Sequence, residues 1–267
     1  MPADPSRQRP GLPSWFPGEA RPVGILLDFD GTLSDIAPTP QEARPAPGAR
    51  EALETLAAAR AVVAVISGRP ALDVASLLGA PVRYVGLYGL EDEEGPVAPP
   101  PELVAALEAT LPEVERAAAL VPGSRVEHKG LQVAVHYRGS PEPEAARRVL
   151  LARLGPLAEA HGYRLLEGKK VVELAAEGGP NKGDVVLWVA RTAGLGAALY
   201  AGDDAADQEA FRALDRLEED GVTALRVAVR HPEAPPALLE AADVVVDDPA
   251  AVVRLLGEVA SRLRRSG

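Results

Sequence analysis

Cysteine is absent from the 267 residues of this chain. Its absence excludes disulfides, thiol nucleophiles and cysteine-based zinc sites, and it fits a reducing compartment. Histidine is scarce, with four residues that make no metal-ligand spacing and no H-E-x-x-H motif. Positive charge is also in short supply, since 28 Lys and Arg against 39 Asp and Glu give a formal net charge of −11. This balance disfavours nucleic acids and anionic membranes as partners, so we expect a small-molecule partner and a monomer.

Long apolar runs are missing as well. No stretch approaches the roughly 20 apolar residues that a membrane-spanning helix requires. Residues 1–20 contain five prolines and no apolar core stretch, so they resemble neither a signal peptide nor a span. We therefore expect residues 1–20 to form a flexible N-terminal arm, and we expect the protein to be soluble and cytoplasmic.

Short apolar runs alternate with helical patterns in the two flanking parts of the chain. Hydrophobic residues make up 47% and charged residues 25%, which are ordinary globular values. Runs of this kind predict buried parallel strands joined by helices. The predicted strands are Val23–Leu27, Ala61–Ile66, Arg83–Leu87, Ala197–Ala201, Val222–Val229 and Val244–Val246, and the predicted helices include 48–60, Asn181–Arg191 and Val252–Arg264.

The middle of the chain follows a different pattern. Two helical stretches, 101–120 and 142–160, alternate with pairs of strands joined by tight turns at Gly130 and at Glu167-Gly168. Adjacent strands joined in this way predict antiparallel hairpins. The fold class is therefore α/β, a Rossmann-like parallel-sheet core with an inserted smaller α+β cap domain. We place the core at residues 21–94 and 178–267 and the cap at residues 95–177.

The pentapeptide Asp28-Phe29-Asp30-Gly31-Thr32 directly follows the first predicted strand. Open α/β sheets bind their ligands at the carboxyl ends of parallel strands. Alternation along an extended chain places Asp28 and Asp30 on the same side. Two carboxylates at such a short distance repel each other unless a cation lies between them. This arrangement points to a hard divalent ion such as Mg²⁺. The alternative is an acidic β-turn after a strand.

Three further elements follow strand ends or begin helices of the same core, at Ser67-Gly68, Lys182 and Asp203-Asp204. Singly, they are ordinary features: a strand-to-helix turn, a solvated lysine and a helix cap. Together they meet the needs of phosphoryl transfer through an aspartyl-phosphate. In this interpretation Asp28 is the nucleophile and Asp30 is the acid and base. Ser67 and Gly68 donate to the phosphate, and Lys182 neutralises its charge. The Mg²⁺ ligands are Asp28, the backbone carbonyl of Asp30 and Asp203, and these ligands are supported by Asp204 and Asp207.

The chain resembles the haloacid-dehalogenase-like phosphatases through D-F-D-G-T, I-S-G-R, N-K-G and Y-A-G-D-D-A-A-D-Q-E-A-F. Within that superfamily it resembles the trehalose-6-phosphate phosphatases through G-L-Y-G, V-E-H-K, V-H-Y-R and K-K-V-V-E-L. The resemblance spans roughly residues 22–260. It implies an Mg²⁺-dependent enzyme with Asp28 as nucleophile and Asp30 as acid and base, which hydrolyses trehalose 6-phosphate to trehalose and phosphate. It also implies that cap residues bind the disaccharide, namely Glu127, Lys129, Arg138, Lys169 and Glu173.

Charged residues on one sheet face suit a sugar phosphate, because they accept bonds from hydroxyls and attract an anion. A solvated polar face is the alternative. Four positions depart from the family pattern, with Tyr88 in place of histidine, Gln208 in place of an acidic residue, and Ala175-Ala176 in place of Arg-Pro. Two other functions stay open: another sugar phosphatase of the superfamily, such as a mannosyl- or glucosyl-3-phosphoglycerate phosphatase or a phosphomannomutase-like enzyme, and a non-catalytic sugar-phosphate sensor.

Overall fold

The structure is a computed structural model that describes residues 11–37, 42–92, 95–96, 101–128, 131–168, 170–176 and 179–265. The chain forms two compact units. Unit 1 comprises Met1–Gly95 together with Asn181–Gly267, and unit 2 comprises Pro96–Pro180. The chain thus leaves unit 1 once, completes unit 2 and returns.

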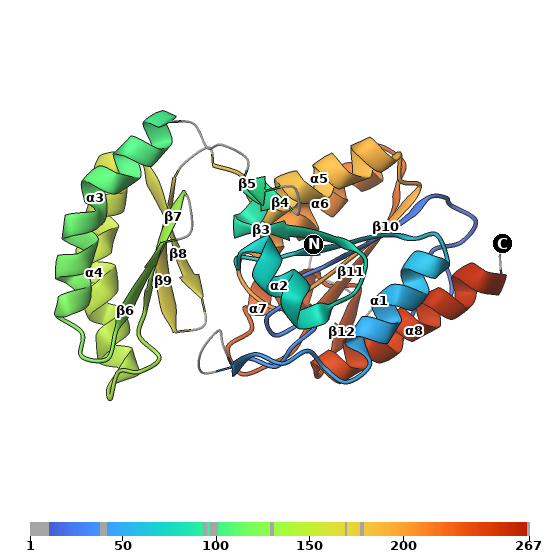
Figure 1. The fold of residues 1–267 in the computed structure, drawn as a ribbon, viewed down its shortest axis with the longest axis horizontal. Coiled ribbons are helices and arrows are strands. Elements are labelled where there is room, and N and C mark those ends of the chain that lie inside the picture. The colour runs from blue at the N-terminus through green and yellow to red at the C-terminus, as the bar shows by residue number, and fades with distance from the viewer. Residues whose placement is uncertain are drawn as a thin grey trace. The chain divides into compact units, whose positions relative to one another are not determined.

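Unit 1 is built on a sheet whose strands follow the order β12-β11-β10-β1-β2-β3-β4-β5 (Figure 1). The pairs from β12 to β3 are parallel, whereas β4 pairs with β3 in the antiparallel sense. The strands are β1 (Val23–Leu27), β2 (Val62–Ile66), β3 (Arg83–Gly86), β4 (Glu91–Asp92), β5 (Gly95–Pro96), β10 (Ala197–Gly202), β11 (Thr223–Val229) and β12 (Val244–Val246). The expected Rossmann-like parallel sheet is confirmed.

Helices cover both faces of this sheet (Figure 1). Alternate residues of β1 point to opposite faces, so Ile25 joins one apolar cluster, with Leu53 and Leu256, while Leu26 joins the other. The first face is covered by α1 (Ala49–Ala58), α2 (Ala71–Leu78) and α8 (Pro249–Arg265), and the second by α5 (Lys182–Ala193), α6 (Asp207–Glu219) and α7 (Pro236–Ala241). A short 3-10 helix, η3 (Leu87–Gly89), follows β3.

Residues 11–20 pack within unit 1 and do not form the expected flexible arm. Phe16 is fully buried and Leu12 nearly so, and both belong to the same apolar cluster as α8. The guanidinium of Arg262 donates to the carbonyl oxygens of Leu12 at 2.9 Å and Phe16 at 2.7 Å. The prediction of an arm is therefore wrong for this segment, because two apolar anchors hold a proline-rich stretch that has no helical or strand periodicity. Residues 1–10 lie outside the described residues.

Unit 2 contains an antiparallel sheet in the order β6-β7-β9-β8, with two helices packed on one face (Figure 1). Val133, Val135 and Leu174 point to that face and are buried. The elements are α3 (Pro101–Ala119), β6 (Arg125–His128), β7 (Gln132–His136), α4 (Pro143–His161), β8 (Tyr163–Gly168) and β9 (Val171–Ala176). The two predicted hairpins are β6 with β7 and β8 with β9.

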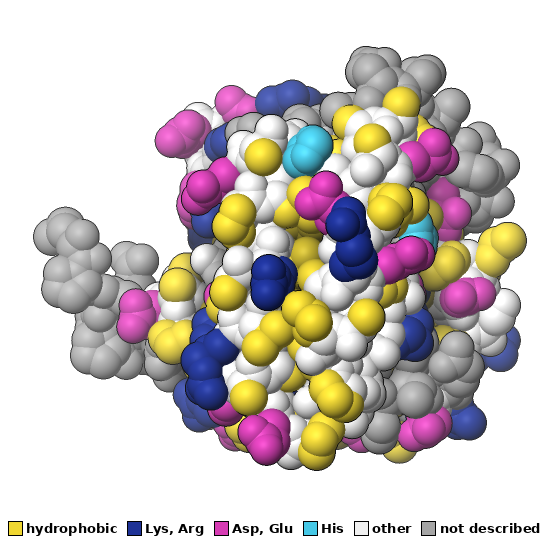
Figure 2. All heavy atoms as spheres, turned by 90° about the vertical axis from the view of Figure 1, so that its left-hand side faces the viewer, with side chains coloured by type: hydrophobic (Ala, Val, Ile, Leu, Met, Phe, Trp, Pro, Cys, Tyr) yellow, Lys and Arg dark blue, Asp and Glu magenta, His cyan; other side chains and the backbone are white. Residues whose placement is uncertain are grey.

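The side of the molecule that carries α3 and α4 displays acidic, basic and apolar side chains interspersed with one another (Figure 2). Arg147 of α4, for example, pairs with Glu167 of β8 at 2.6 Å. Within the described residues, no helix is both long and apolar enough to cross a membrane.

Candidate active site

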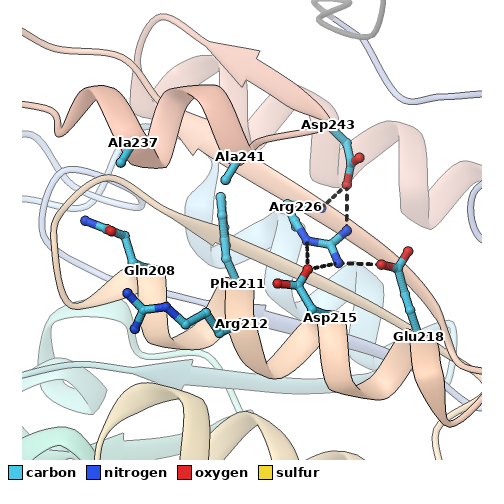
Figure 3. Close-up of a pocket in the computed structure, with 9 residues that line it drawn as sticks. All are labelled: Gln208, Phe211, Arg212, Asp215, Glu218, Arg226, Ala237, Ala241 and Asp243. Atoms are coloured by element: carbon cyan, nitrogen blue, oxygen red, sulfur yellow. Dashed lines mark hydrogen bonds and ion pairs between the residues drawn. The ribbon is translucent and has the colours of Figure 1, made fainter. Parts of the chain in front are cut away.

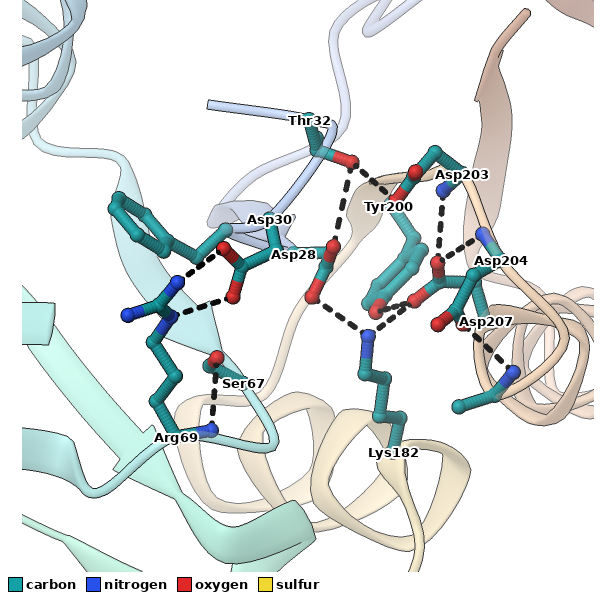
Figure 4. Close-up of polar contacts among 12 residues, drawn as sticks. Asp28, Asp30, Thr32, Ser67, Arg69, Lys182, Tyr200, Asp203, Asp204 and Asp207 are labelled. Carbon is teal, nitrogen blue, oxygen red and sulfur yellow. Dashed lines mark hydrogen bonds and ion pairs between the residues drawn. The ribbon is translucent and has the colours of Figure 1, made fainter. Parts of the chain in front are cut away.

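The carboxyl ends of three neighbouring parallel strands bring the predicted core residues together (Figure 4). Leu27 of β1 is in register with Val65 of β2 and with Ala201 of β10. Asp28, Ser67 and Asp203 each follow one of these strands directly. The amide of Asp28 donates to the carbonyl of Ala201 at 2.9 Å, which continues the pairing past the end of β1.

Lys182 reaches the same place from the first turn of α5. Its Nζ donates to Oδ1 of Asp28 at 2.7 Å and to Oδ1 of Asp207 at 2.6 Å, and the side chain is 3% exposed. Asn181 caps this helix, since its side chain accepts from the amides of Gly183 and Asp184. Gly183 permits the close approach of α5 to α6, because a Cβ on residue 183 would lie 2.5 Å from the backbone oxygen of Glu209 in α6.

Asp207 is fully buried and its carboxylate accepts four hydrogen bonds. Oδ1 accepts from Lys182 and from the hydroxyl of Tyr200 at 2.7 Å, and Oδ2 accepts from the amides of Asp203 at 2.7 Å and Asp204 at 2.9 Å. All of its strong acceptor positions are engaged by the protein. Asp207 therefore holds Lys182 and the loop after β10 in place, and it is poorly suited to bind a metal directly.

The buried charges are unbalanced. One oxygen each of Asp28, Asp203 and Asp207 lie within 4.8 Å of one another, and Lys182 is the cation that contacts two of them. Burial raises the pKa of Asp28 well above its usual value, and the other carboxylates add to this rise while Lys182 opposes it. Burial lowers the pKa of Lys182, but Asp207 and Asp28 outweigh it and the pKa lies well above its usual value.

A hard divalent cation suits this donor set. Asp28 and Asp203 supply buried carboxylate oxygens, no sulfur or imidazole ligand belongs to the cluster, and a 2+ charge would offset the excess of negative charge. The carboxylate of Asp30 does not join this cluster.

Asp30 turns its carboxylate to Arg69, contrary to the expectation that Asp28 and Asp30 share one side. Arg69 donates from Nε and from its terminal nitrogen to the two oxygens of Asp30, each at 2.6 Å (Figure 4). Its guanidinium also lies over the ring of Phe29, 5.5 Å from the centroid. The chain bends after Phe29, where Thr32, Leu33 and Ser34 all donate to the Phe29 carbonyl, so the strand alternation assumed for Asp30 no longer applies.

The phosphate-binding residues predicted after β2 form a tight turn. Oγ of Ser67 accepts from the amide of Arg69 at 3.1 Å, which leaves the serine proton available to donate. Gly68 lies against Tyr88, and a Cβ on residue 68 would be 2.6 Å from the Tyr88 hydroxyl. Tyr88 itself has a left-handed backbone with φ of 58°.

Residues that the sequence analysis missed also contribute to this site. Thr32 donates to Asp203 at 3.4 Å, Tyr200 supports Asp207, and Arg69 binds Asp30. Arg69 and Thr32 lie inside the recognised motifs I-S-G-R and D-F-D-G-T, so these motifs could have identified them as site residues. Tyr200 has no signal of its own, because an aromatic residue within a buried strand usually serves only packing.

In unit 2, Glu127 and Glu173 share a sheet face. Both are in register with Ala134 of β7, one from each side, so they point the same way. Glu127 contacts Nε2 of His136 at 2.5 Å, and Glu173 is buried. Arg138 follows β7 and is half-buried. Lys129 and Lys169 lie outside the described residues.

A separate hollow of about 400 Å³ lies between α6, β11 and α7 (Figure 3). Its buried Arg226 is bound by Asp215, Glu218 and Asp243 at 2.5 to 3.3 Å. Because three carboxylates already surround this cation, the cluster ties α6 to the sheet and offers no site for an anion.

The parallel sheet, the buried carboxylates at its strand ends and the second, α+β unit define a haloacid-dehalogenase-like protein. The model of the trehalose-phosphatase family matches residues 26–240. The chain belongs to that family.

Named relatives and solved structures agree with this assignment. Trehalose-phosphate phosphatase of Mycobacterium leprae is 36% identical over 80% of this chain and 52% of its own length. The corresponding protein of Mycobacterium bovis is 36% identical over 92% of this chain and 63% of its own length. The C-terminal domain of trehalose-6-phosphate phosphatase from C. albicans has the same fold, with a TM-score of 0.76, 20% identity, and coverage of 91% of this chain and 93% of that one. The chain thus spans between half and two thirds of the length of these two mycobacterial relatives.

Proposed function

We propose that this chain is an Mg²⁺-dependent phosphatase that hydrolyses trehalose 6-phosphate to trehalose and phosphate through an aspartyl-phosphate on Asp28. The observation that carries the proposal is the buried contact of Lys182 with Asp28 beside Asp203 and Asp207. A carboxylate at a strand end, held by a lysine that can also neutralise a phosphoryl group, suits covalent phosphoryl transfer. Membership of the trehalose-phosphatase family supports the choice of substrate.

Two steps follow from these roles. The carboxylate of Asp28 attacks phosphorus and the sugar oxygen leaves, while Asp30 gives that oxygen a proton. Asp30 then takes a proton from water, which attacks the phosphorus of the acyl phosphate and frees Asp28 with release of phosphate. Asp30 accepts one hydrogen bond from Arg69 on each oxygen, which leaves a lone pair on each oxygen to carry the proton that it donates.

Ser67, Gly68 and Lys182 are proposed to bind the phosphoryl oxygens. Asp28, the backbone carbonyl of Asp30 and Asp203 would hold Mg²⁺, supported by Asp204 and Asp207. When bound, Mg²⁺ would neutralise charge on the nucleophile and on the transferred group. The raised pKa of Asp28 gives a reason for the cation, since the nucleophile must be ionised to react.

The proposal keeps the predicted domains and their roles. Catalysis is assigned to the core, residues 21–94 and 178–267, and sugar recognition to the cap, residues 95–177. Glu127, Lys129, Arg138, Lys169 and Glu173 are proposed to bind the sugar. A metabolic sugar phosphate as substrate and a chain without cysteine favour the cytoplasm, and we propose a monomer.

A phosphate-release panel tests the substrate. The purified protein would receive trehalose 6-phosphate, glucose 6-phosphate, mannosyl-3-phosphoglycerate and glucosyl-3-phosphoglycerate, each with Mg²⁺ and with EDTA. We expect the highest kcat/KM for trehalose 6-phosphate, loss of activity in EDTA, and recovery with Mg²⁺. A higher kcat/KM for another sugar phosphate would change the substrate, and binding without any release would indicate a sensor.

The recognition residues are tested separately with Glu127→Ala and Glu173→Ala. Losing a hydrogen-bond partner to a sugar hydroxyl costs about 1–3 kcal/mol, so kcat/KM for trehalose 6-phosphate should fall about tenfold to a hundredfold. A small aryl phosphate should be hydrolysed nearly as before. Glu167→Ala is the matched control, because Glu167 lies on the helix-covered face of the same sheet and pairs with Arg147. Equal losses on both substrates would assign the glutamates a folding role.

A further inference from the structure

His231 lies in the loop between β11 and α7, directly beyond the strand that neighbours β10. Its side chain is 12% exposed. The ring contacts Asp203, which the proposed function makes a metal ligand. Nothing in the spacing of the four histidines indicated this contact, although a polar residue just beyond a parallel strand is a recognisable signal.

The hydrogen bonds of the ring fix which nitrogen carries the proton. Nδ1 accepts from the backbone amide of Glu233 at 3.1 Å. An amide N–H can only donate, so Nδ1 is the unprotonated nitrogen and the ring proton is on Nε2. Nε2 lies 3.0 Å from Oδ2 of Asp203 and 3.1 Å from its backbone oxygen. The imidazole therefore donates to Asp203 from a ring that the backbone orients.

Thr32 and His231 both contact the carboxylate of Asp203. It is fully buried, and Oδ1 accepts from Thr32 at 3.4 Å, a longer hydrogen bond than the one from His231 to Oδ2. A carboxylate that binds a metal binds it better when a second group holds its orientation. A histidine with one nitrogen fixed by the backbone and the other on such a carboxylate has the geometry for this task.

We propose that His231 is a positioning residue of the metal site, whose Nε2–H holds the Asp203 carboxylate in the orientation that takes Mg²⁺. This inference rests on the proposed function, since it requires Asp203 to be a metal ligand. It concerns how tightly the metal is held and gives His231 no part in the phosphoryl transfer itself.

Two variants of His231 separate the contribution of its Nε2 from that of its Nδ1. In His231→Gln the amide nitrogen falls near the position of Nε2 and can still donate to Asp203. In His231→Asn the shorter side chain places its amide near Nδ1, where it can accept from Glu233 but does not reach Asp203. The pair therefore keeps or removes the hydrogen bond to Asp203 with little change in polarity.

Mg²⁺ binding to the metal-free proteins, without substrate, is the principal measurement, by isothermal titration calorimetry and by the rise of Tm with Mg²⁺ concentration. We expect His231→Asn to bind Mg²⁺ about tenfold to a hundredfold more weakly than wild type, and His231→Gln to stay within about threefold. In phosphate release, His231→Asn should need more Mg²⁺ while its kcat at saturating Mg²⁺ recovers.

Unchanged Mg²⁺ affinity in His231→Asn would overturn the proposal, and so would equal weakening in both variants. Wild-type protein that binds no Mg²⁺ would instead refute the metal site of the proposed function. A measurement on the wild type does not depend on variant folding. Long-range ¹H–¹⁵N NMR should find the proton of His231 on Nε2 and a shift of its signals on addition of Mg²⁺, whereas a proton on Nδ1 would contradict the inference.

Discussion

Replacing the proposed nucleophile Asp28 by asparagine should abolish turnover and yet stabilise the metal-free protein. Asparagine fits the same space, can accept from Lys182 through its oxygen and can donate toward Thr32 through its nitrogen. What it removes is a buried negative charge, and burial is the main cause of the raised pKa of Asp28. Function and stability are therefore opposed at this position.

The size of the effect follows from the distances. Asp28 and each of the two other carboxylates have oxygens no more than 4.8 Å apart, a repulsion of roughly 3.5 kcal/mol per pair at an effective dielectric constant of about 20. Lys182 at 2.7 Å supplies an attraction of roughly 6 kcal/mol on the same basis. These nearly cancel, and the desolvation cost of the charge remains, so Asp28→Asn should raise the free energy of unfolding by about 1–3 kcal/mol. That corresponds to a rise in Tm of about 3–9 °C.

Thermal unfolding in EDTA is the assay, and Asp30→Asn is the control. The same chemical change two residues later removes the charge that Arg69 pairs with and at least one of its two hydrogen bonds, so it should lower Tm slightly. In saturating Mg²⁺ the advantage of Asp28→Asn should shrink or reverse, because the wild type gains more from the cation. An Asp28→Asn protein that melts below the wild type in EDTA would refute the reasoning.

The raised pKa of Asp28 also predicts how the Tm difference between Asp28→Asn and the wild type changes with pH. The pKa of Asp28 is higher in the folded state than in the unfolded chain. The cost of its ionised form is therefore absent below the unfolded pKa and grows as pH rises through the folded pKa. The Tm advantage of Asp28→Asn in EDTA should be largest in mildly alkaline buffer and should narrow in mildly acidic buffer. A gap that widens on acidification would contradict the assignment.

Three other substitutions test separate parts of the structure. Asp207→Asn removes one of the two charge partners of Lys182 and at least one of the four hydrogen bonds that Asp207 accepts. It should therefore cost about 3–5 kcal/mol in denaturant unfolding and most of the phosphate release, and near-native activity would contradict the role given to Asp207. Gly202→Ala places a Cβ 2.3 Å from Cγ of Asp207 and should impair both activity and stability, whereas Gly257→Ala in α8, where a Cβ meets nothing within 4 Å, should stabilise by about 1 kcal/mol. Phe16→Ala should lower the free energy of unfolding by about 3–5 kcal/mol, and Trp15→Ala, at a residue 49% exposed, by no more than about 0.5 kcal/mol; equal effects would mean that residues 11–20 do not pack as described.

Strand ends could be predicted from the sequence because a buried parallel strand is a continuous apolar run, and the residue after it has to lie at the sheet edge. Asp28, Ser67 and Asp203 were found in this way. The start of α5 could also be predicted from its N-cap residue Asn181, and this places Lys182 in the first turn of the helix. The fold class followed from the change between parallel and hairpin patterns along the chain.

Pairings between distant side chains were not predictable in this way. The contact of Arg69 with Asp30 depends on a bend after Phe29 that breaks strand alternation. The contact of His231 with Asp203 depends on two loops from neighbouring strands. The packing of Phe16 depends on a helix more than 200 residues later, since Arg262 is separated from it by 246 positions. None of these has a local period or spacing that a single sequence displays.

The central claim is that trehalose 6-phosphate transfers its phosphoryl group to Asp28. The most direct test is to quench the wild-type enzyme during turnover of trehalose 6-phosphate with Mg²⁺, reduce the acyl phosphate with borohydride, and locate the modified residue by mass spectrometry. The account predicts conversion of Asp28 alone to homoserine, dependent on both substrate and Mg²⁺. Modification of Asp30 or another carboxylate, or active turnover with no trapped residue, would contradict it.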